Sequence, residues 1–347
     1  MTKEEAFVDF EEEVEELLQN YEEIFRQDLR KNQNVLKDKV IDGLKSICEK
    51  VYDFQKENEE YKVTYFQFSI LRTSIVNKTY TMLLNTYNPS WYLDDHTQYI
   101  EVDLSFLFNS LEDLQRKLHE KSKPYMGKIN KSHIEKIILK QAIGYNQYIA
   151  YAARLILQNI DEAKWFQKVQ KTDIYCIRWG EYQDQSEFVF AMDTNSKTTN
   201  DFVKILELTN DEAHKDALVY KVFKDSEILD IICTERNMMF INFKGSIMND
   251  CNFKKSILLG SNFKGSRLIN CSFEESIMQT ANFKNATLKN VNFNKSNLKG
   301  VSFVGTAFEE VSFENTLLDG AIFSRESVPF LHLSPSQLQV IYIEGDQ

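Results

Sequence analysis

The sequence predicts a multi-domain chain: a mostly helical α+β domain over residues 1–235, a β-helix over residues 236–328 and a short cap over residues 329–347. Two observations carry this division. Near the N-terminus, apolar residues recur at a spacing of three to four, as on an amphipathic helix. From Ile241 onward, large apolar residues recur instead at every fifth position. With 347 residues, the chain is long enough for more than one domain and for a sizeable core.

The five-residue repeat continues without a gap through 17 large apolar positions, namely Phe243, Met248, Phe253, Leu258, Phe263, Leu268, Phe273, Met278, Phe283, Leu288, Phe293, Leu298, Phe303, Phe308, Phe313, Leu318 and Phe323. On a helix these residues would spread around the axis, and on a flat strand they would alternate between faces. A coil that turns a corner at every repeat places all of them inside. Residues that tolerate a positive φ, such as Gly245, Asp250 and Asn270, stand two positions after them and fit such corners.

Residues 236–325 resemble the pentapeptide-repeat family, whose consensus is A-(D/N)-L-x-x. The match is carried by Asn242-Phe243, Asn252-Phe253, Asn262-Phe263, Ala281-Asn282-Phe283 and Asn292-Phe293. The resemblance implies a right-handed quadrilateral β-helix with four pentapeptides per coil, whose equivalent residues stack as in a β ladder.

The tail after Phe323 has the pattern of a cap. Ser334 and Pro335 fit the first positions of a helix, and in the pentapeptide-repeat family such a cap often mediates dimers. Leu317 and Ile322 should face outward near the last coil and call for a cover, which apolar tail residues of the same chain or of a second copy would supply. We therefore expect a homodimer through the C-terminal end.

We recognise no family in the N-terminal domain, so its elements come from local patterns alone. A helical hairpin is expected over residues 1–60, with the polar segment Lys31–Asn34 between its two apolar stripes. The further elements expected, in chain order, are an antiparallel meander between Val63 and Phe108, a capping box at Ser132–Glu135 before a buried helix at Ile134–Ile160, a strand hairpin formed by Ile174–Trp179 and Phe188–Met192, and helix over residues 201–235.

Charge, cysteine content and hydropathy limit the partners and the cellular location that the sequence allows. The net charge is −11, and residues 241–325 carry 10 basic and 7 acidic residues, a net of +3, which leaves −14 for the rest. An acidic total makes nucleic acid an improbable partner. The five cysteines form no CxxC pair and predict reduced thiols; Cys251 and Cys271 should fill inward slots on adjacent coils without a disulfide. No apolar run fits a membrane helix and the first residues lack a secretion signal, so we expect a cytoplasmic protein without membrane contact.

The sequence contains no convincing catalytic constellation, cofactor motif or metal site. Asp94-Asp95-His96 is a weak metal candidate that reads more simply as a solvated turn. We therefore predict a non-enzymatic interaction or scaffold protein with an unidentified protein partner, and a bacterial immunity or biosynthetic system is its expected setting. Two alternatives stay open: a self-resistance protein that protects DNA gyrase or topoisomerase by imitating DNA, as the family resemblance implies, and an enzyme in the unrecognised N-terminal domain.

The candidate binding residues are two sets on the outside of the coil. Lys244, Lys264 and Lys284 should stack on one face, where they would stay open for a partner. Ile247, Ile257 and Ile277 should point outward on two other faces, and an exposed apolar patch commonly marks an interface. We expect the N-terminal domain or a partner chain to pack over these isoleucines.

Overall fold

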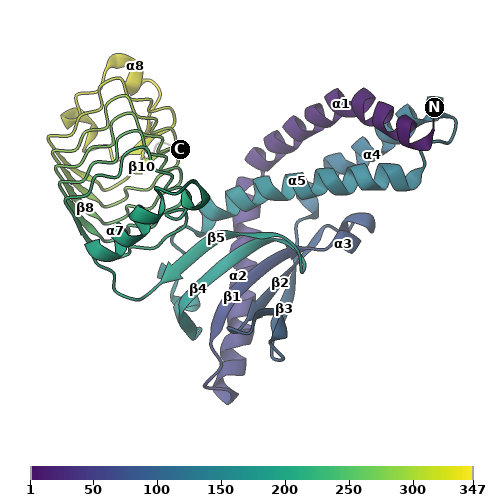
Figure 1. Ribbon diagram of the computed structural model, residues 1–347, viewed down its shortest axis with the longest axis horizontal. Helices are drawn as coiled ribbons and strands as arrows, with labels where there is room; N and C mark the ends of the chain where they lie inside the picture. The colour runs from purple at the N-terminus through teal and green to yellow at the C-terminus, as the bar shows by residue number, and fades with distance from the viewer. Residues whose placement is uncertain (1, 346–347) are drawn as a thin grey trace. The chain divides into compact units, whose positions relative to one another are not determined.

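The computed structural model describes residues 2–345 and divides into two compact units, with the division after Phe190. Unit 1 (residues 1–190) contains an α+β fold, and unit 2 (residues 191–347) contains the coil (Figure 1). Each unit is built around its own buried apolar residues, as domains generally are.

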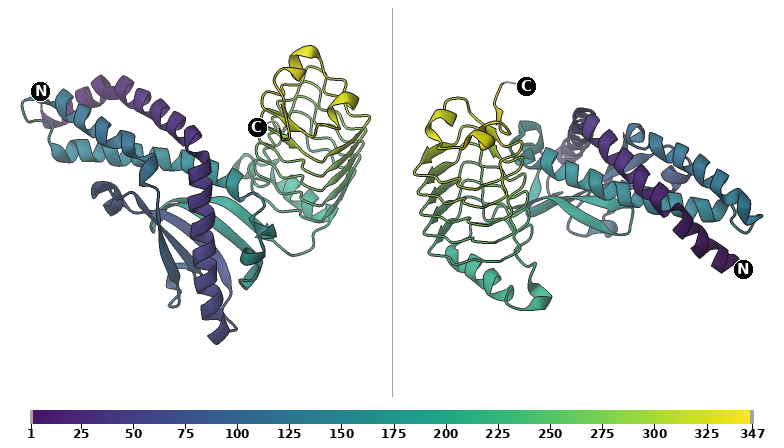
Figure 2. Two further views of the ribbon diagram at one scale, coloured as in Figure 1. Left: turned by 180° about the vertical axis from the view of Figure 1, so that it is seen from behind. Right: turned by 90° about the horizontal axis from the view of Figure 1, so that it is seen from above.

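Two long helices begin unit 1, α1 (Lys3–Lys31) and α2 (Gln33–Glu57). They do not fold back on each other, so the predicted hairpin over residues 1–60 is wrong. Beyond Asn32, α2 turns away and runs across one face of the sheet, while α1 lies along other helices (Figures 1 and 2). The two apolar stripes have different partners: Phe25 of α1 stacks on Tyr145 with ring centroids 4.2 Å apart. In α2, the missing side chain of Gly43 lets the helix approach Val102 of the sheet.

A five-stranded sheet forms the centre of unit 1, in the order β3-β2-β1-β4-β5. Its first three strands are the predicted antiparallel meander, and β4 joins β1 in parallel. The strand bounds are β1 (Val63–Ile70), β2 (Thr81–Tyr87), β3 (Gln98–Asp103), β4 (Lys171–Glu181) and β5 (Ser186–Asp193). The predicted hairpin of Ile174–Trp179 and Phe188–Met192 corresponds to β4 and β5. Within the range of the predicted meander, Ile75 and Val76 do not belong to a strand but to the short helix α3 (Arg72–Val76).

The helix α5 (Lys131–Leu157) is the predicted buried helix, and it packs against α1, α4 (Asn109–Ser122) and the sheet. Its N-cap is Asn130 rather than the predicted Ser132. The Asn130 side chain accepts a hydrogen bond from the backbone N–H of His133 at 3.1 Å, and Nδ1 of His133 accepts one from the backbone N–H of Asn130 at 3.2 Å. The short elements of unit 1 are η1 (Trp91–Leu93), η2 (Ser105–Leu107), η3 (Lys123–Tyr125), η4 (Ile160–Glu162) and α6 (Lys164–Gln167).

The coil of unit 2 begins earlier than predicted. The helix expected over residues 201–235 is limited to α7 (Thr199–Leu208) and the single turn η5 (Glu212–His214). Parallel bridges already join Val222 to Asn242 and Ile232 to Asn252, ahead of the predicted start at residue 236. Phe223 and Ile228 occupy inward positions of this first coil and are fully buried. The five-residue pattern thus extends backward through residues that lack the family's preferred Asn-Phe pairs.

Each coil takes 20 residues, because Met248 pairs with Leu268 and Leu268 with Leu288 in parallel register. Four faces result, which we name by their first inward residue in the repeat: the Phe243, Met248, Phe253 and Leu258 faces. Of the predicted inward residues, Phe308 is half-buried and the others are buried. The strands are β6 (Glu227–Leu229), β7 (Ile247–Asn249), β8 (Arg267–Ile269), β9 (Thr287–Lys289), β10 (Ser302–Phe303), β11 (Ala307–Glu309) and β12 (Ile322–Phe323).

The tail forms the predicted cap on the last coil. The helix α8 (Pro335–Leu338) follows η6 (Val328–Phe330), with Ser334 as N-cap and proline at its first position. The strand β13 (Tyr342–Ile343) then pairs in parallel with β12 and adds a rung to the Phe243 face. The cap therefore covers the end of the coil partly with a helix and partly with one more strand.

Candidate binding surfaces of the β-helix

The interior of the coil is stacked and hydrogen-bonded, which makes its outer faces rigid. Phe263 and Phe283 stack with ring centroids 4.7 Å apart and planes 3° from parallel. Small inward residues donate hydrogen bonds to backbone carbonyls, some within their own coil and some on the preceding one; the hydroxyl of Ser256 donates to the carbonyl of Cys233 of the preceding coil at 2.8 Å. A fixed interior of this kind holds outward side chains in straight columns, with equivalent residues one rung apart.

All five cysteines are free and buried, as predicted. Cys251 and Cys271 lie on adjacent coils, and their thiols donate to the carbonyls of Asn249 and Ile269, each at 3.3 Å. Burial raises the pKa of Cys48, Cys176 and Cys233 to about 12. These thiols are protonated near neutral pH and act as small apolar side chains.

The predicted lysine column is present on the Phe243 face. Parallel bridges join Asn242 to Asn262 and Asn262 to Asn282, which places Lys244, Lys264 and Lys284 on successive rungs. The side-chain oxygen of each asparagine accepts a hydrogen bond from the backbone N–H of the lysine two positions later, which holds the lysine backbone in place. For Asn282 and Lys284 the distance is 3.0 Å. Lys284 is exposed, whereas Lys244 and Lys264 are half-buried. The column is thus a basic strip of limited length.

The predicted isoleucines point outward but do not form one patch. Ile257 and Ile277 are bridged neighbours on the Leu258 face and are 36% and 41% exposed. Ile247 lies on the Met248 face, two corners away, and is 42% exposed. The structure therefore brings two of the three together. The expected packing of the N-terminal domain or a partner chain over them stays a prediction.

The Phe253 face carries charges that largely neutralise one another. Lys254 Nζ lies 2.9 Å from Glu274 Oε2 and 3.2 Å from Glu275 Oε1, and Lys295 approaches Glu274 at 3.8 Å. The hydrogen bond from Lys254 lowers the pKa of the Glu274 carboxyl. This face shows that side chains of opposite charge pair across one rung of the coil.

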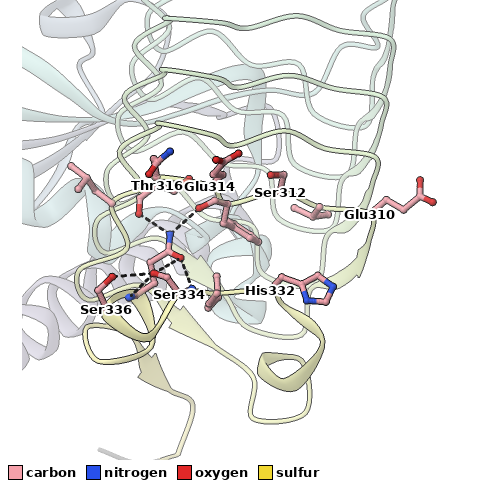
Figure 3. Close-up of a pocket in the computed structure, with 13 residues that line it drawn as sticks. Glu310, Ser312, Glu314, Thr316, His332, Ser334 and Ser336 are labelled. Carbon is pink, nitrogen blue, oxygen red and sulfur yellow. Dashed lines mark hydrogen bonds between the residues drawn. The ribbon is translucent and has the colours of Figure 1, made fainter.

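At the C-terminal end of the same face, a groove of about 690 Å³ lies between the last rung and the cap (Figure 3). One wall is residues 310–317 and the other is residues 332–337. Gln337 holds the two walls together, because its Nε2 donates to the carbonyls of Phe313 at 2.8 Å and Thr316 at 3.0 Å. Glu310 and Glu314 line the groove and form no ion pair within residues 2–345. The sequence pattern did not predict this groove.

The sequence analysis also did not predict a row of polar side chains that crosses the sheet of unit 1. Asn85, Gln67 and Arg178 occupy register-matched positions of β2, β1 and β4. The Gln67 side chain is fully buried, and the side-chain oxygens of Gln67 and Asn85 have no hydrogen-bond partner among the described residues. Buried amides normally have partners, so this row is an unusual polar feature. A sequence signal was present in the alternation of Gln67 and Ser69 with apolar residues in β1.

The weak metal candidate has a structural role. Asp94 is buried, and its carboxylate accepts hydrogen bonds from the Tyr61 hydroxyl at 2.8 Å and from the backbone N–H groups of Asn88 and His96. Desolvation, with a further contribution from Asp94, raises the pKa of Tyr61. The described part of the chain contains no group of three or more His, Cys, Asp or Glu side chains placed to hold a metal. Within the same residues, no helix is long and apolar enough to cross a bilayer.

The fold and its columns define a stacked-coil repeat structure. The family model described as "Pentapeptide repeat region" matches residues 246–323, so this segment is a pentapeptide repeat region, as the sequence predicted. Unit 1 lies outside the match. No curated protein matches the chain at a significant level.

Solved structures similar to the chain include several pentapeptide repeat proteins. One is Rfr23 from the cyanobacterium Cyanothece 51142, at 18% identity over 34% of this chain and 95% of that chain, with a TM-score of 0.27. Another is a thylakoid-lumen protein from Arabidopsis thaliana, at 23% identity over 38% and 80%, with a TM-score of 0.18. A third is QnrB1, a plasmid-mediated fluoroquinolone resistance protein, at 13% identity over 37% and 85%, with a TM-score of 0.16.

Proposed function

We propose that the protein is a non-catalytic scaffold that binds a protein partner through a right-handed, quadrilateral β-helix. Its setting is the cytosol of a bacterial cell, in an immunity or biosynthetic system. The observation that carries the proposal is the pair Ile257 and Ile277, two apolar side chains held side by side on neighbouring rungs and exposed to solvent. Two exposed isoleucines on a rigid face suit an interface, because their burial releases water at little cost in side-chain order.

The basic column adds the second half of the surface. Lys244, Lys264 and Lys284 lie on the Phe243 face, which adjoins the Leu258 face around the coil. A partner that wraps this corner would meet apolar contacts on one side and positive charge on the other. Charge of this kind contributes more to the association rate and to specificity than to affinity. The partner is therefore expected to present an apolar patch flanked by carboxylates.

Affinity capture from the source cell tests this proposal. The full-length chain should recover a partner protein, and the double variant I257D/I277D should recover at least about tenfold less, because it introduces charge into an apolar contact. N297D is the matched control: Asn297 follows Ile277 on the same column, is already polar, and its replacement should leave recovery unchanged. Equal recovery by the wild type and I257D/I277D would contradict the proposal.

Topoisomerase protection by DNA mimicry is the second candidate, since acidic side chains gather at the C-terminal end of the coil, at Glu309, Glu310, Glu314 and Asp319. Mimicry of a duplex needs acidic faces along its length. Here the lysine column and the paired charges around Lys254 and Glu274 interrupt them. Recovery of topoisomerase subunits in the same capture would favour this candidate over the scaffold.

A small-molecule activity in unit 1 is the third candidate, supported by the buried polar row of Asn85, Gln67 and Arg178. Turnover of a small molecule by the purified chain would favour it.

The proposal includes a homodimer through the C-terminal end. Leu317, Leu338, Val340 and Tyr342 expose 38–55% of their surface there, so the cap leaves apolar area uncovered. Light scattering should give twice the mass of one chain, and the charged variant L338D should give a single chain because it disrupts this area. A wild-type protein that scatters as a monomer across the accessible concentration range would exclude the dimer.

A further inference from the structure

The last rung of the Phe253 face has an open hydrogen-bonding edge. On the preceding rung, the N–H of Phe293 donates to the carbonyl of Ser312 at 2.9 Å, and the N–H of Lys295 donates to the carbonyl of Glu314 at 2.9 Å. The equivalent groups one rung later are the N–H groups of Phe313 and Asn315, with the carbonyl of Val311 as acceptor. These three groups have no hydrogen bond within residues 2–345.

The edge is open because the chain leaves the coil before completing this face. One rung beyond Phe313 would place Leu333, but the chain makes a tight turn there, with the N–H of Leu333 donating to the carbonyl of Leu331 at 2.7 Å. The groove of about 690 Å³ occupies the space where the next rung would run (Figure 3). An edge beside a groove of this size can accept an added strand.

The Phe243 face shows what such an addition looks like. There the chain's own tail supplies the extra rung: β13 pairs with β12, and the N–H of Tyr342 donates to the carbonyl of Ala321 at 2.8 Å. An extended segment at the end of this coil is therefore stable on one face. On the Phe253 face the described chain supplies none.

The charge of the groove selects the occupant. Two terminal carboxylates are paired with a lysine on the rung below, Glu309 with Lys289 and Asp319 with Lys299. Glu314 has Asn294 below it, so its carboxylate has no such lysine. A basic residue on an added strand would lie one rung above Glu314, at the spacing that lets Lys254 reach Glu274 at 2.9 Å.

A second copy of the chain is a poor occupant for the same reason. Residues 309–345 contain six acidic residues, Glu309, Glu310, Glu314, Asp319, Glu326 and Glu344, and one basic residue, Arg325. A symmetric contact centred on this groove would bring Glu310 and Glu314 against their own copies, and like charges placed together oppose association. The homodimer proposed above would form instead through the apolar area of Leu338, Val340 and Tyr342, none of which lines the groove. The geometry instead favours a chain of opposite charge.

We propose that this groove binds an extended, basic peptide segment of a partner protein, which adds one more parallel rung to the edge formed by Val311, Phe313 and Asn315. Its central residue is apolar and lies one rung beyond Phe313, beside Leu333, which lines the groove and already packs against the core of the coil. The flanking residues point outward, and a lysine or arginine among them pairs with Glu314 or Glu310. This inference rests on the proposed scaffold function and names one partner chemistry for it.

Fluorescence anisotropy with three labelled heptapeptides tests the inference: alternating Lys/Val, alternating Lys/Leu and alternating Arg/Val. We expect at least one to bind the full-length chain in the micromolar range, with affinity falling as salt is raised. The E310Q/E314Q variant should bind roughly fivefold or more weakly, because it removes both carboxylates with which the basic residue of the peptide could pair. E227Q is the control, since Glu227 is an exposed acid at the other end of the coil.

A peptide with alternate backbone nitrogens methylated should fail to bind, because strand addition needs its N–H groups. The inference is overturned if all three peptides fail at about 1 mM, if E310Q/E314Q binds as tightly as the wild type, or if the methylated peptide binds equally well. If the peptides fail to bind because self-association of the chain buries the groove, the inference is also overturned, and a second copy of the chain is the occupant. Partner capture that depends on Ile257 and Ile277 while the peptides fail would leave the scaffold function standing.

Discussion

Replacing Phe283 with alanine is expected to lower the free energy of unfolding of the β-helix by about 3–5 kcal/mol, the usual range for deleting a buried aromatic ring. Phe283 is fully buried and stacks on Phe263 at 4.7 Å and Phe303 at 5.3 Å. It also meets Phe273 and Phe293 edge to face. The ring thus contacts neighbours on three successive coils, and the cavity left by alanine cannot collapse without shifting the ladder on both sides.

Chemical denaturation followed by far-UV circular dichroism measures this effect. All three tryptophans, Trp91, Trp165 and Trp179, lie in unit 1, so tryptophan fluorescence follows unit 1 in the same sample. F330A is the matched control, because Phe330 is in unit 2 but 79% exposed, and its loss should change stability by less than about 0.5 kcal/mol. A difference of under about 1 kcal/mol between F283A and F330A would show that the ladder does not carry the stability of the coil.

The repeat could be predicted because its information is local. The direction of each side chain follows from its place in the five-residue unit, so the inward residues were identified without any knowledge of distant contacts. The early coil was missed because it lacks Asn-Phe pairs. Its inward residues Leu218, Phe223 and Ile228 nevertheless continue the same spacing and could have extended the prediction backward.

The prediction of a helical hairpin was wrong because the packing of these two helices depends on distant residues rather than on local sequence. The stripes of α1 and α2 were identified correctly, and a polar segment between two amphipathic helices is compatible with a tight turn. The partners of each stripe are distant in sequence: Phe25 meets Tyr145, and Gly43 approaches Val102. No pattern within residues 1–60 shows whether two stripes pack on each other or on separate surfaces.

The groove could not be predicted from the sequence either. It exists because the tail continues the Phe243 face with Tyr342 and Ile343 and leaves the Phe253 face without a further rung. Which face the tail extends depends on a turn near Leu331 and on the hydrogen bonds of Gln337 to the last coil. Those contacts join residues more than 20 positions apart and have no counterpart in the repeat.

Replacing Gly180 with alanine is expected to destabilise unit 1 by about 1–3 kcal/mol or more, the cost of forcing a methyl group into a filled space. A Cβ at this position would lie 2.2 Å from the carbonyl oxygen of Gln185 and 2.5 Å from the Cα of Ser186. Both are backbone atoms, at the last residue of the β4–β5 turn and the first residue of β5, so no flexible side chain can move aside. The strain would reach the neighbouring Trp179, whose indole N–H donates to Asn146 of α5 at 2.7 Å.

Gly144 is the matched control, because it lies within α5 and a Cβ there would meet no atom within 4 Å apart from the backbone of its own helix. G144A should stabilise unit 1 by about 0.5–1 kcal/mol, since glycine is a poor residue inside a helix. The two alanine substitutions should therefore shift the urea midpoint of tryptophan fluorescence in opposite directions. A G180A protein as stable as the wild type would mean that the β4–β5 turn is not held as tightly as its contacts indicate, since a relaxed turn would admit the methyl group without strain.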